Sequence, residues 1–267
     1  MRNKFINYLG VRINFNVNAD NFKPNFKHLL EKGGSKIYTI NPEFIVDSFF
    51  DTNFKLELNS SDLNVIDGVG LLFAIKKYFK SEIGSKDLKD LKTLTGVDLV
   101  FQILEEADKN KLSVFLLGGS KELDSASKAI QNIKSKYPNI KLIGASSDFK
   151  FSPEDDLISV NFINESLKEA SLKELDVLLV GYGHKKQEFW IQRNSSKIPA
   201  RVSVGVGGTI DYLAGTVNRA PLWVRNLGFE WLFRLFTQPS RALRIFKATF
   251  IFSYLSSSLL SKNLSKK

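Results

Sequence analysis

The feature that most constrains the fold is a recurring pattern in which a short apolar run stops abruptly at glycine or at a small polar residue. Its clearest example is the run at 175–180, which ends at Gly181 and Gly183 and is followed by polar residues at 184–188. This order is typical of a buried strand, a glycine turn and the start of a helix. In an open α/β sheet, backbone amides and the positive ends of helices meet at that point, so the pattern predicts a ligand site there.

Similar runs recur along the chain and alternate with segments of helical spacing. Strands are expected at 36–40, 64–66, 112–117, 140–143, 175–180 and 201–206. Helices are expected from about Glu43, at 71–79, from 96 or 97 to 109, at 122–136, from Pro153 to about Ala170 after a capping Ser152, and around Trp190, whereas 81–95 has the composition of a loop. This alternation predicts a Rossmann-like α/β fold, with a mostly parallel sheet and helices on both faces. The segment 204–211, VGVGGTID, lacks the third glycine of a dinucleotide fingerprint, which is therefore not supported.

Composition excludes several kinds of chemistry. The chain has 267 residues, 43% of them apolar, and no cysteine, so it can bury a substantial core but has no disulfide framework and no thiolate. Because only His28 and His184 could supply imidazole, a zinc site and a Ser/His/Asp arrangement are both disfavoured. No Asp-x-Asp sequence occurs, which disfavours a carboxylate pair holding a metal on a nucleotide diphosphate. No N-terminal segment has the pattern of a signal peptide, so the expected compartment is the cytoplasm.

Positive charge is concentrated toward the C-terminal end. From Arg219 onward the chain carries nine cations and one anion, Glu230, so this segment accounts for +8 of the net +10. Such a charge requires an anionic partner, which could be nucleic acid, anionic lipid or a phosphorylated substrate. The composition changes near residue 215, and we therefore divide the chain into an α/β core, 1–215, and a basic aromatic appendage, 216–267.

Within the appendage, an apolar stripe at helical spacing consists of Leu243, Phe246, Phe250 and Tyr254, beyond Pro239, which should interrupt any longer helix. The run at 245–260 is too short and too polar to span a bilayer. Two interpretations fit the pattern equally: a helix that lies in the membrane interface, and an amphipathic helix packed on the protein's own core. Because arginines lie beside the aromatic residues, we favour the membrane.

Polar side chains near strand ends are the candidates for chemistry. Asp67 follows the strand at 64–66 between an isoleucine and a glycine, and partial desolvation there would suit a general base. The same residue could instead cap the following helix, which is the commoner role of a lone Asp-Gly. Thr39 and Asn41 could likewise bind a ligand or only satisfy turn backbone. The remaining candidates are Gln187, Asp211 and the arginines of the appendage.

Several motifs together resemble a known family. They are TINP (39–42), DGVG (67–70), TGVDL (95–99), VFLLGG (114–119), VGYGHKKQEFWI (180–191), VGVGGTIDYLAGTVNRAP (204–221) and FEWLFRL (229–235) followed by QPSRALR (238–244). In this order they resemble the WecG/TagA/CpsF family of bacterial glycosyltransferases, and the resemblance covers nearly the whole chain.

The resemblance implies an inverting glycosyltransferase that needs no metal or other cofactor. Such an enzyme would move an N-acetylmannosamine-type sugar, its uronic acid or a related hexose from a UDP donor to a polyprenyl-diphosphate-linked GlcNAc-type acceptor. Its products would feed teichoic acid, capsule or exopolysaccharide synthesis. It would be cytoplasmic and peripherally bound to the inner face of the cytoplasmic membrane, with no nucleic-acid partner, and whether it forms a homo-oligomer stays open.

The resemblance also implies roles for individual residues. Asp67 matches the proposed catalytic base, which would deprotonate the acceptor hydroxyl, and Thr39 and Asn41 match residues that line the site near it. The other matches are Gln187, which would contact substrate, Asp211 in the glycine-rich motif, Gly181, Gly183, Gly207 and Gly208 as one wall of a sugar-nucleotide pocket, and Arg234, Arg241 and Arg244, which would hold the lipid diphosphate.

Two positions depart from the family pattern. Thr93 stands where the family usually has an arginine, with Lys92 beside it, and Lys185, preceded by His184, stands where it usually has a proline. These changes put the donor contact in doubt. The alternatives are another UDP-hexose, such as UDP-glucose or UDP-glucuronic acid, and a non-catalytic partner in polysaccharide assembly. A nucleic-acid-binding protein is disfavoured because the charges are mixed with bulky aromatic residues and the core is nearly neutral.

Overall fold

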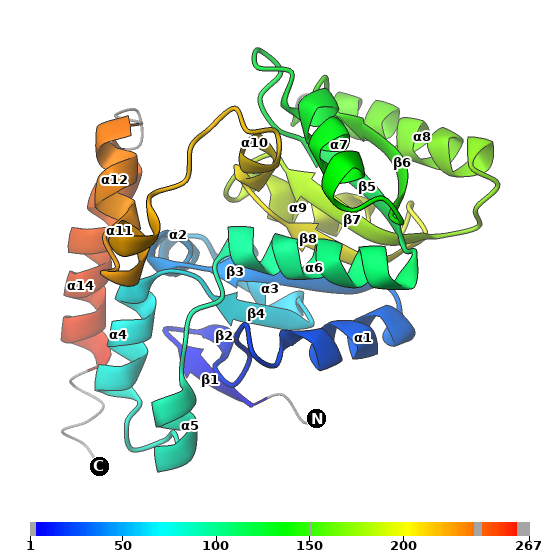
Figure 1. The fold of residues 1–267 in the computed structure, drawn as a ribbon. Helices are drawn as coiled ribbons and strands as arrows, with labels where there is room; N and C mark the ends of the chain where they lie inside the picture. Colours follow the sequence, from blue (N-terminus) through cyan, green and yellow to red (C-terminus); the bar gives the residue numbers. More distant parts are fainter. Residues whose placement is uncertain (1–3, 150, 238–241, 261–267) are drawn as a thin grey trace.

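The centre of the molecule is a six-stranded parallel sheet with the order β4-β3-β8-β7-β5-β6 (Figure 1). The computed structural model describes residues 4–149, 151–237 and 242–260. The strands are β3 (Ser35–Ile40), β4 (Leu63–Ile66), β5 (Ser113–Gly118), β6 (Lys141–Ser146), β7 (Leu175–Gly181) and β8 (Ala200–Gly205). The predicted parallel α/β sheet is confirmed.

Helices cover both faces of this sheet, as the sequence predicts (Figure 1). One face carries α1 (Phe22–Lys32), α6 (Gly96–Asn110), α7 (Ser125–Lys136) and α10 (Thr209–Leu213), and the other carries α2 (Pro42–Phe50), α3 (Thr52–Ser60), α8 (Pro153–Glu169) and α9 (Lys186–Asn194). Strand β5 is buried throughout: Phe115 belongs to one apolar cluster and its neighbour Leu116 to the other. Burial on both faces explains why such strands are continuous apolar runs rather than alternating ones.

The structure also contains elements that the apolar pattern did not predict. An antiparallel hairpin, β1 (Phe5–Tyr8) and β2 (Val11–Asn14), lies beside β4, where the Asn64 backbone N donates to Asn14 Oδ1 at 2.9 Å. The prediction of a loop at 81–95 is wrong in part, because helix α5 (Ser85–Asp90) lies within it. No residue of α5 is buried, so no apolar periodicity marks this helix.

Two predicted helix starts have different outcomes. Helix α8 begins as expected, since the Ser152 side chain accepts a hydrogen bond from the backbone N of Asp155 and Pro153 occupies the first turn. Helix α7 begins at Ser125, later than the expected residue 122. Polar residues precede Ser125, so helical spacing alone could not separate the turn from the helix.

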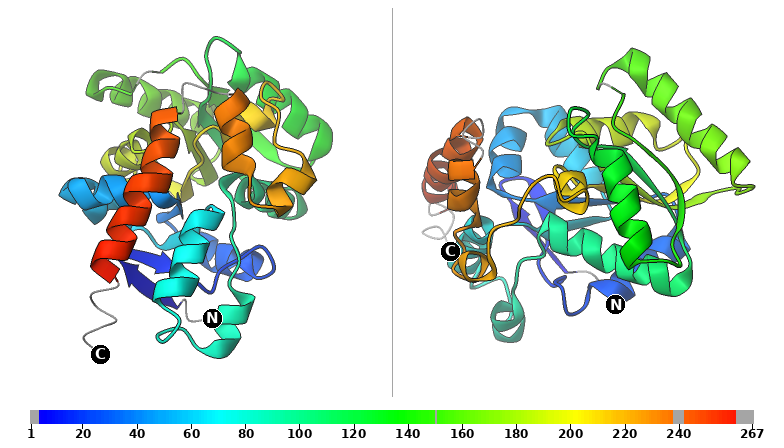
Figure 2. Two further views of the ribbon diagram at one scale, coloured as in Figure 1. Left: turned by 90° about the vertical axis from the view of Figure 1, so that its left-hand side faces the viewer. Right: turned by 45° about the horizontal axis from the view of Figure 1, so that its top comes forward.

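The C-terminal helices pack against the same side of the core as α4 (Val69–Tyr78). Helices α11 (Leu222–Asn226) and α12 (Glu230–Thr237) come first. A rod then begins with α13 (Ala242–Phe246), continues through α14 (Phe252–Leu255) and reaches Leu260 beside α4 (Figure 2, left). Phe252 packs into the core, and the hydroxyl of Tyr8 donates to Ser256 Oγ at 2.7 Å. The rod is thus attached to the core by one face.

The opposite face of the rod carries the predicted apolar stripe. Its four residues, Leu243, Phe246, Phe250 and Tyr254, are 79%, 52%, 68% and 70% exposed. The rod packs on the core as the second interpretation predicts, although it presents the stripe outward; a position in the membrane interface stays a prediction. No helix of the described ranges is long and apolar enough to cross a membrane. Pro239 lies outside the described residues, and the division of the chain near residue 215 stays a prediction.

Candidate active site

A cavity of about 510 Å³ lies at the carboxyl ends of β3 and β4, a volume within the range of small-molecule sites. The start of α6 and the C-terminal helices complete its wall. Three predicted site residues line it, Asn41, Asp67 and Arg244. The other charged or hydroxyl-bearing side chains of its described lining are Glu43, Thr93, Thr95, Asp98, Arg219, Arg225, Glu230 and Thr249. Arg241 and the side chain of Arg234 lie outside the described residues.

Three helices begin at this cavity. The side chain of Asn41 caps α2 by accepting from the backbone N of Glu43, and Thr95 caps α6 in the same way for Asp98. Asp67 follows β4, where its backbone N donates to Ile40 O at 2.7 Å, but the cap position of α4 is Gly68. The expectation that Asn41 satisfies backbone groups is therefore confirmed, and the alternative of Asp67 as the cap of the following helix is wrong. The positive ends of α2, α4 and α6 together favour an anionic ligand.

On one side of the cavity, an ion pair joins helix α6 to the segment between α10 and α11. Arg219 Nη1 and Nη2 donate to the two carboxylate oxygens of Asp98 at 2.7 and 2.9 Å, and Nη2 also reaches Thr95 Oγ1 at 3.1 Å. Burial would raise the pKa of Asp98, but the hydrogen bonds from Arg219 and Thr95 hold it below its usual value. Asp98 is thus ionised and bound to Arg219 through both carboxylate oxygens.

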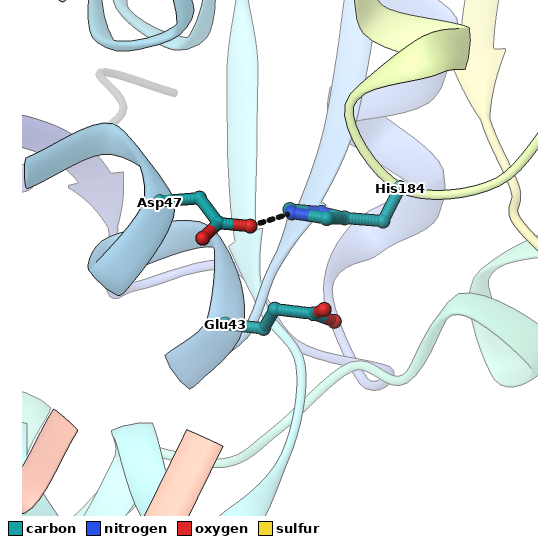
Figure 3. A group of neighbouring side chains, drawn as sticks. All are labelled: Glu43, Asp47 and His184. Carbon is teal, nitrogen blue, oxygen red and sulfur yellow. Dashed lines mark hydrogen bonds and ion pairs between the residues drawn. The ribbon is translucent and has the colours of Figure 1, made fainter. Parts of the chain in front are cut away.

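The opposite side attaches the C-terminal rod to α2. Arg244 Nε and Nη2 donate to Glu43 at 2.8–3.0 Å, so the predicted lipid-diphosphate arginine is paired with a carboxylate. One turn further along α2, Asp47 accepts from Lys247 Nζ at 3.0 Å and lies 2.7 Å from His184 Nε2 (Figure 3). Burial would raise the pKa of Asp47, but these two partners outweigh it and lower the pKa to about 2.

This cluster is also the group of described side chains with spacing suited to a metal. Ligand atoms of Glu43, Asp47 and His184 lie within 4.8 Å of one another (Figure 3). Both carboxylates are already bonded to cations of the rod, Arg244 and Lys247. Their charge is balanced within the protein, and we assign the cluster to holding the rod rather than to a metal.

The other predicted site residues within the described part of the chain are not among the lining of the cavity. Thr39 is 8% exposed, and Gln187 is 2% exposed with its Nε2 donating to Glu188 Oε1 and its Oε1 accepting from the backbone N of Gly207, both at 2.7 Å. Asp211 accepts from the backbone N of Ser120 at 2.9 Å. These contacts join the turns after β5, β7 and β8 to one another, and substrate contact by these residues stays a prediction.

The glycines after β7 and β8 lie in the same region. A Cβ on Gly181 would be 2.7 Å from Ile210 Cδ1 and 2.9 Å from Gly207 O, so only glycine lets these turns pack this closely. Gly183 has φ +86° with open space around it, which marks a left-handed turn rather than a close contact. None of Gly181, Gly183, Gly207 and Gly208 is among the described lining of the cavity.

Several residues in and beside the cavity were not predicted from the sequence. Glu43 and Asp47 stand four apart after Asn-Pro, a spacing that puts both on one face of a helix, but nothing in the sequence shows that cations of the appendage meet them. Arg219 and Arg225 were counted only as part of the basic tail. The signal for Arg219 was its place before Ala220 and Pro221 in the motif at 204–221, whereas Arg225 lies between that motif and the one at 229–235.

Together the fold and the cavity define an α/β protein with a site for an anionic ligand at the carboxyl edge of a parallel sheet. The sequence model of the family described as "Glycosyl transferase WecG/TagA/CpsF family" matches residues 6–266. The chain belongs to this family and is a glycosyltransferase, as the resemblance implied.

Named relatives agree with this assignment. A protein of Bacillus subtilis (strain 168) is 30% identical over 220 residues, which cover 82% of this chain and 78% of the relative. Proteins of Bacillus spizizenii and Staphylococcus aureus (strain MRSA252) are 28% and 29% identical over 218 residues, with 82% of this chain and 77% and 78% of the relatives covered. All three are named N-acetylglucosaminyldiphosphoundecaprenol N-acetyl-beta-D-mannosaminyltransferase.

Proposed function

We propose that this glycosyltransferase moves an N-acetylmannosamine-type sugar, or its uronic acid, from a UDP donor to a GlcNAc-type sugar on polyprenyl diphosphate, with inversion at the anomeric carbon. The names of the relatives support the transferred sugar and the acceptor. The observation that carries the proposal is the position of Asp67, a carboxylate in a cavity at which three helices begin.

In the proposed reaction Asp67 acts as the general base. It takes the proton of the acceptor hydroxyl while the hydroxyl oxygen bonds to the anomeric carbon of the donor. The bond between that carbon and the UDP oxygen breaks, and UDP leaves with the electron pair. A single displacement from the opposite face inverts the anomeric carbon. The negative charge on the leaving UDP is stabilised by helix starts and by arginines of the cavity wall.

We also propose that the protein binds peripherally to the inner face of the cytoplasmic membrane through the C-terminal rod. The support is its outward apolar stripe, in which Leu243, Phe250 and Tyr254 are each at least two-thirds exposed. Two more large apolar side chains are exposed on the helices before the rod: Trp223 on α11 is 66% exposed, and Phe236 on α12 is 78% exposed. An apolar surface of this kind beside a basic segment suits an anionic bilayer, and the lipid acceptor would enter the cavity from there.

A donor screen tests the proposed reaction. Purified protein is incubated with a GlcNAc-diphosphate-lipid and with UDP-N-acetylmannosamine, its uronic acid, UDP-glucose or UDP-glucuronic acid, and the product is analysed by mass spectrometry. We expect transfer from UDP-N-acetylmannosamine or its uronic acid, with the opposite anomeric configuration by NMR. Transfer only from a glucose-type donor would refute the sugar assignment, and no transfer from any donor would refute the function. Retention of configuration would refute the single displacement.

A further inference from the structure

The arginines of the cavity differ in whether a carboxylate already binds them. Arg219 is paired with Asp98, and Arg244 is paired with Glu43. The guanidinium of Arg225 makes no hydrogen bond and no ion pair with the described residues, although it lines the same cavity. Among the arginines of the described lining, Arg225 is thus the one with no hydrogen bond or ion pair to a described carboxylate.

Burial makes this state of Arg225 costly in the absence of a ligand. Its Nε is shielded from solvent and has no hydrogen-bond partner. Removing a guanidinium N–H from water without a replacement partner is unfavourable, and the loss is recovered when an anion accepts from it. The nearby carboxylate of Asp98 interacts with Arg225 through its charge but accepts no hydrogen bond from it; it accepts from Arg219 and Thr95.

The surroundings of Arg225 specify what kind of anion fits. Thr93, at the approach to α6, lines the same cavity, and its hydroxyl makes no hydrogen bond with the described residues. An arginine fork and a free hydroxyl are both donors, and the N-terminal end of the 15-residue helix α6 adds partial positive charge close by. Donors in this arrangement match the several acceptor oxygens of a phosphate group better than a single carboxylate.

We propose that Arg225 is a binding residue for the diphosphate group of a substrate, with the Thr93 hydroxyl as a second donor. That the anion is a diphosphate rests on the proposed function. Two substrates of that reaction carry the group, the UDP donor and the polyprenyl-diphosphate acceptor. Arg225 and Thr93 line the same cavity as Arg244, but Arg244 is already bound to Glu43.

Binding measurements test this role without requiring turnover. The wild type, Arg225→Gln, Arg225→Lys and a control, Lys134→Gln on the exposed surface of α7, are titrated calorimetrically with UDP, farnesyl diphosphate and uridine. We expect Arg225→Gln to weaken binding of at least one diphosphate by about 10- to 100-fold, with uridine affinity unchanged. Arg225→Lys should lose part of that affinity, and Lys134→Gln none. The weakened ligand identifies the substrate that Arg225 holds.

Stability separates a binding role from a structural one. Arg225 makes no hydrogen bond with the described residues and interacts with Asp98 only through its charge, so Arg225→Gln should melt close to the wild-type temperature. The assignment is overturned if Arg225→Gln binds UDP and farnesyl diphosphate as the wild type does, if uridine affinity falls equally, or if the wild type binds neither diphosphate. A wrong transferred sugar would refute the proposed function and leave these affinities unchanged, so the two failures are distinguishable.

Discussion

Two pairs of strand ends on one sheet have opposite roles. The turns after β3 and β4 carry Asn41 and Asp67, and both side chains line the cavity. The turns after β7 and β8 are richer in glycine, yet they are packed closely in part: a Cβ on Gly181 would collide with Ile210, and Gln187 is 2% exposed, although Gly183 and Gly207 have open space beside them. Both pairs lie at the carboxyl edge of the same parallel sheet, where open α/β sheets bind ligands.

This difference shows that a glycine-rich turn is not sufficient evidence for a ligand. At Gly181 the missing side chain makes room for a neighbouring turn of the same protein. At β4 the strand end borders a cavity whose wall includes the C-terminal rod, which is bound to α2 by the ion pairs Arg244–Glu43 and Lys247–Asp47. The open strand end therefore involves contacts between residues far apart in the sequence.

The largest effect on transfer activity is expected from a mutation at the ends of β3 and β4, which border the cavity. Asp67→Asn removes the proposed base, so transfer to the lipid acceptor should fall by about 1,000-fold or more, while the melting temperature and UDP affinity stay near those of the wild type. Asp211→Asn is the matched control, because it changes a carboxylate on the β8 side that bonds the Ser120 backbone. We expect it to keep transfer within about threefold of the wild type. Equal losses in both variants would contradict the distinction.

Glu188, on the glycine-rich side, should affect the pH dependence of stability. It is fully buried, and burial raises its pKa to about 7 despite opposing interactions with His184 and Gln187. The folded state therefore holds the proton more tightly than the unfolded chain, and the stability that this gives is complete below about pH 4.5 and lost as the pH rises through about 7. Glu188→Gln should remove up to about 3 kcal/mol of the change in unfolding free energy between pH 5 and 8.

Urea denaturation at several pH values measures this effect. Glu43→Gln is a useful comparison, because it also neutralises a buried glutamate, but one that is paired with Arg244. Its destabilisation should appear at neutral pH, where that ion pair is formed. A Glu188→Gln protein with the pH dependence of the wild type would show that Glu188 does not titrate in the folded state as the structure implies.

Gly181→Ala should lower the stability of the fold rather than act directly on the transfer reaction. The added Cβ would lie within 3 Å of Ile210 and of the Gly207 carbonyl, and we expect a loss of about 1–3 kcal/mol of unfolding free energy. Gly183→Ala, which has open space but φ +86°, should lose about 1 kcal/mol. Melting temperatures and transfer rates of both variants separate the two effects. Normal stability with lost transfer in Gly181→Ala would place substrate at this turn.

The smallest expected effect concerns the rod that closes the cavity. Replacing Phe250 by serine removes an exposed apolar side chain, so affinity for vesicles containing anionic lipid should fall by about 10-fold with no loss of stability. Phe252→Ser changes the buried face of the same rod and should instead destabilise the protein. Sedimentation with vesicles and thermal melts distinguish them. Unchanged vesicle affinity in Phe250→Ser would refute the membrane role of the stripe.

Much of the fold could be predicted because its information is local. Buried strands such as β5 and β7 are continuous apolar runs, and the Ser152–Pro153 start of α8 is a local cap. Helix α5 was missed because only one of its side chains, the partly buried Leu88, packs against the core, and the β1–β2 hairpin was missed because each of its strands has only four residues. Local patterns carry no signal for such elements.

The site could be predicted only in part, because many of its contacts join residues far apart in the sequence. Asn41 and Asp67 stand at strand ends and are visible as polar interruptions, whereas the partners of Glu43 and Asp47 are about 200 residues away. No spacing rule connects Arg225 to Thr93 either. Because Thr93 replaces the usual arginine of the family, the sequence left the contact with the UDP-sugar in doubt. In the structure, Arg225 from the distant helix α11 lines the same cavity as Thr93.

A crystal structure with UDP bound tests the central claim most directly. We predict that the diphosphate lies in the cavity beside Asp67, between the start of α2 and Arg225, and that the turns at 181–183 and 207–208 keep their packing. A diphosphate bound on those glycine turns, with the cavity between β4 and the C-terminal rod unoccupied, would contradict the account.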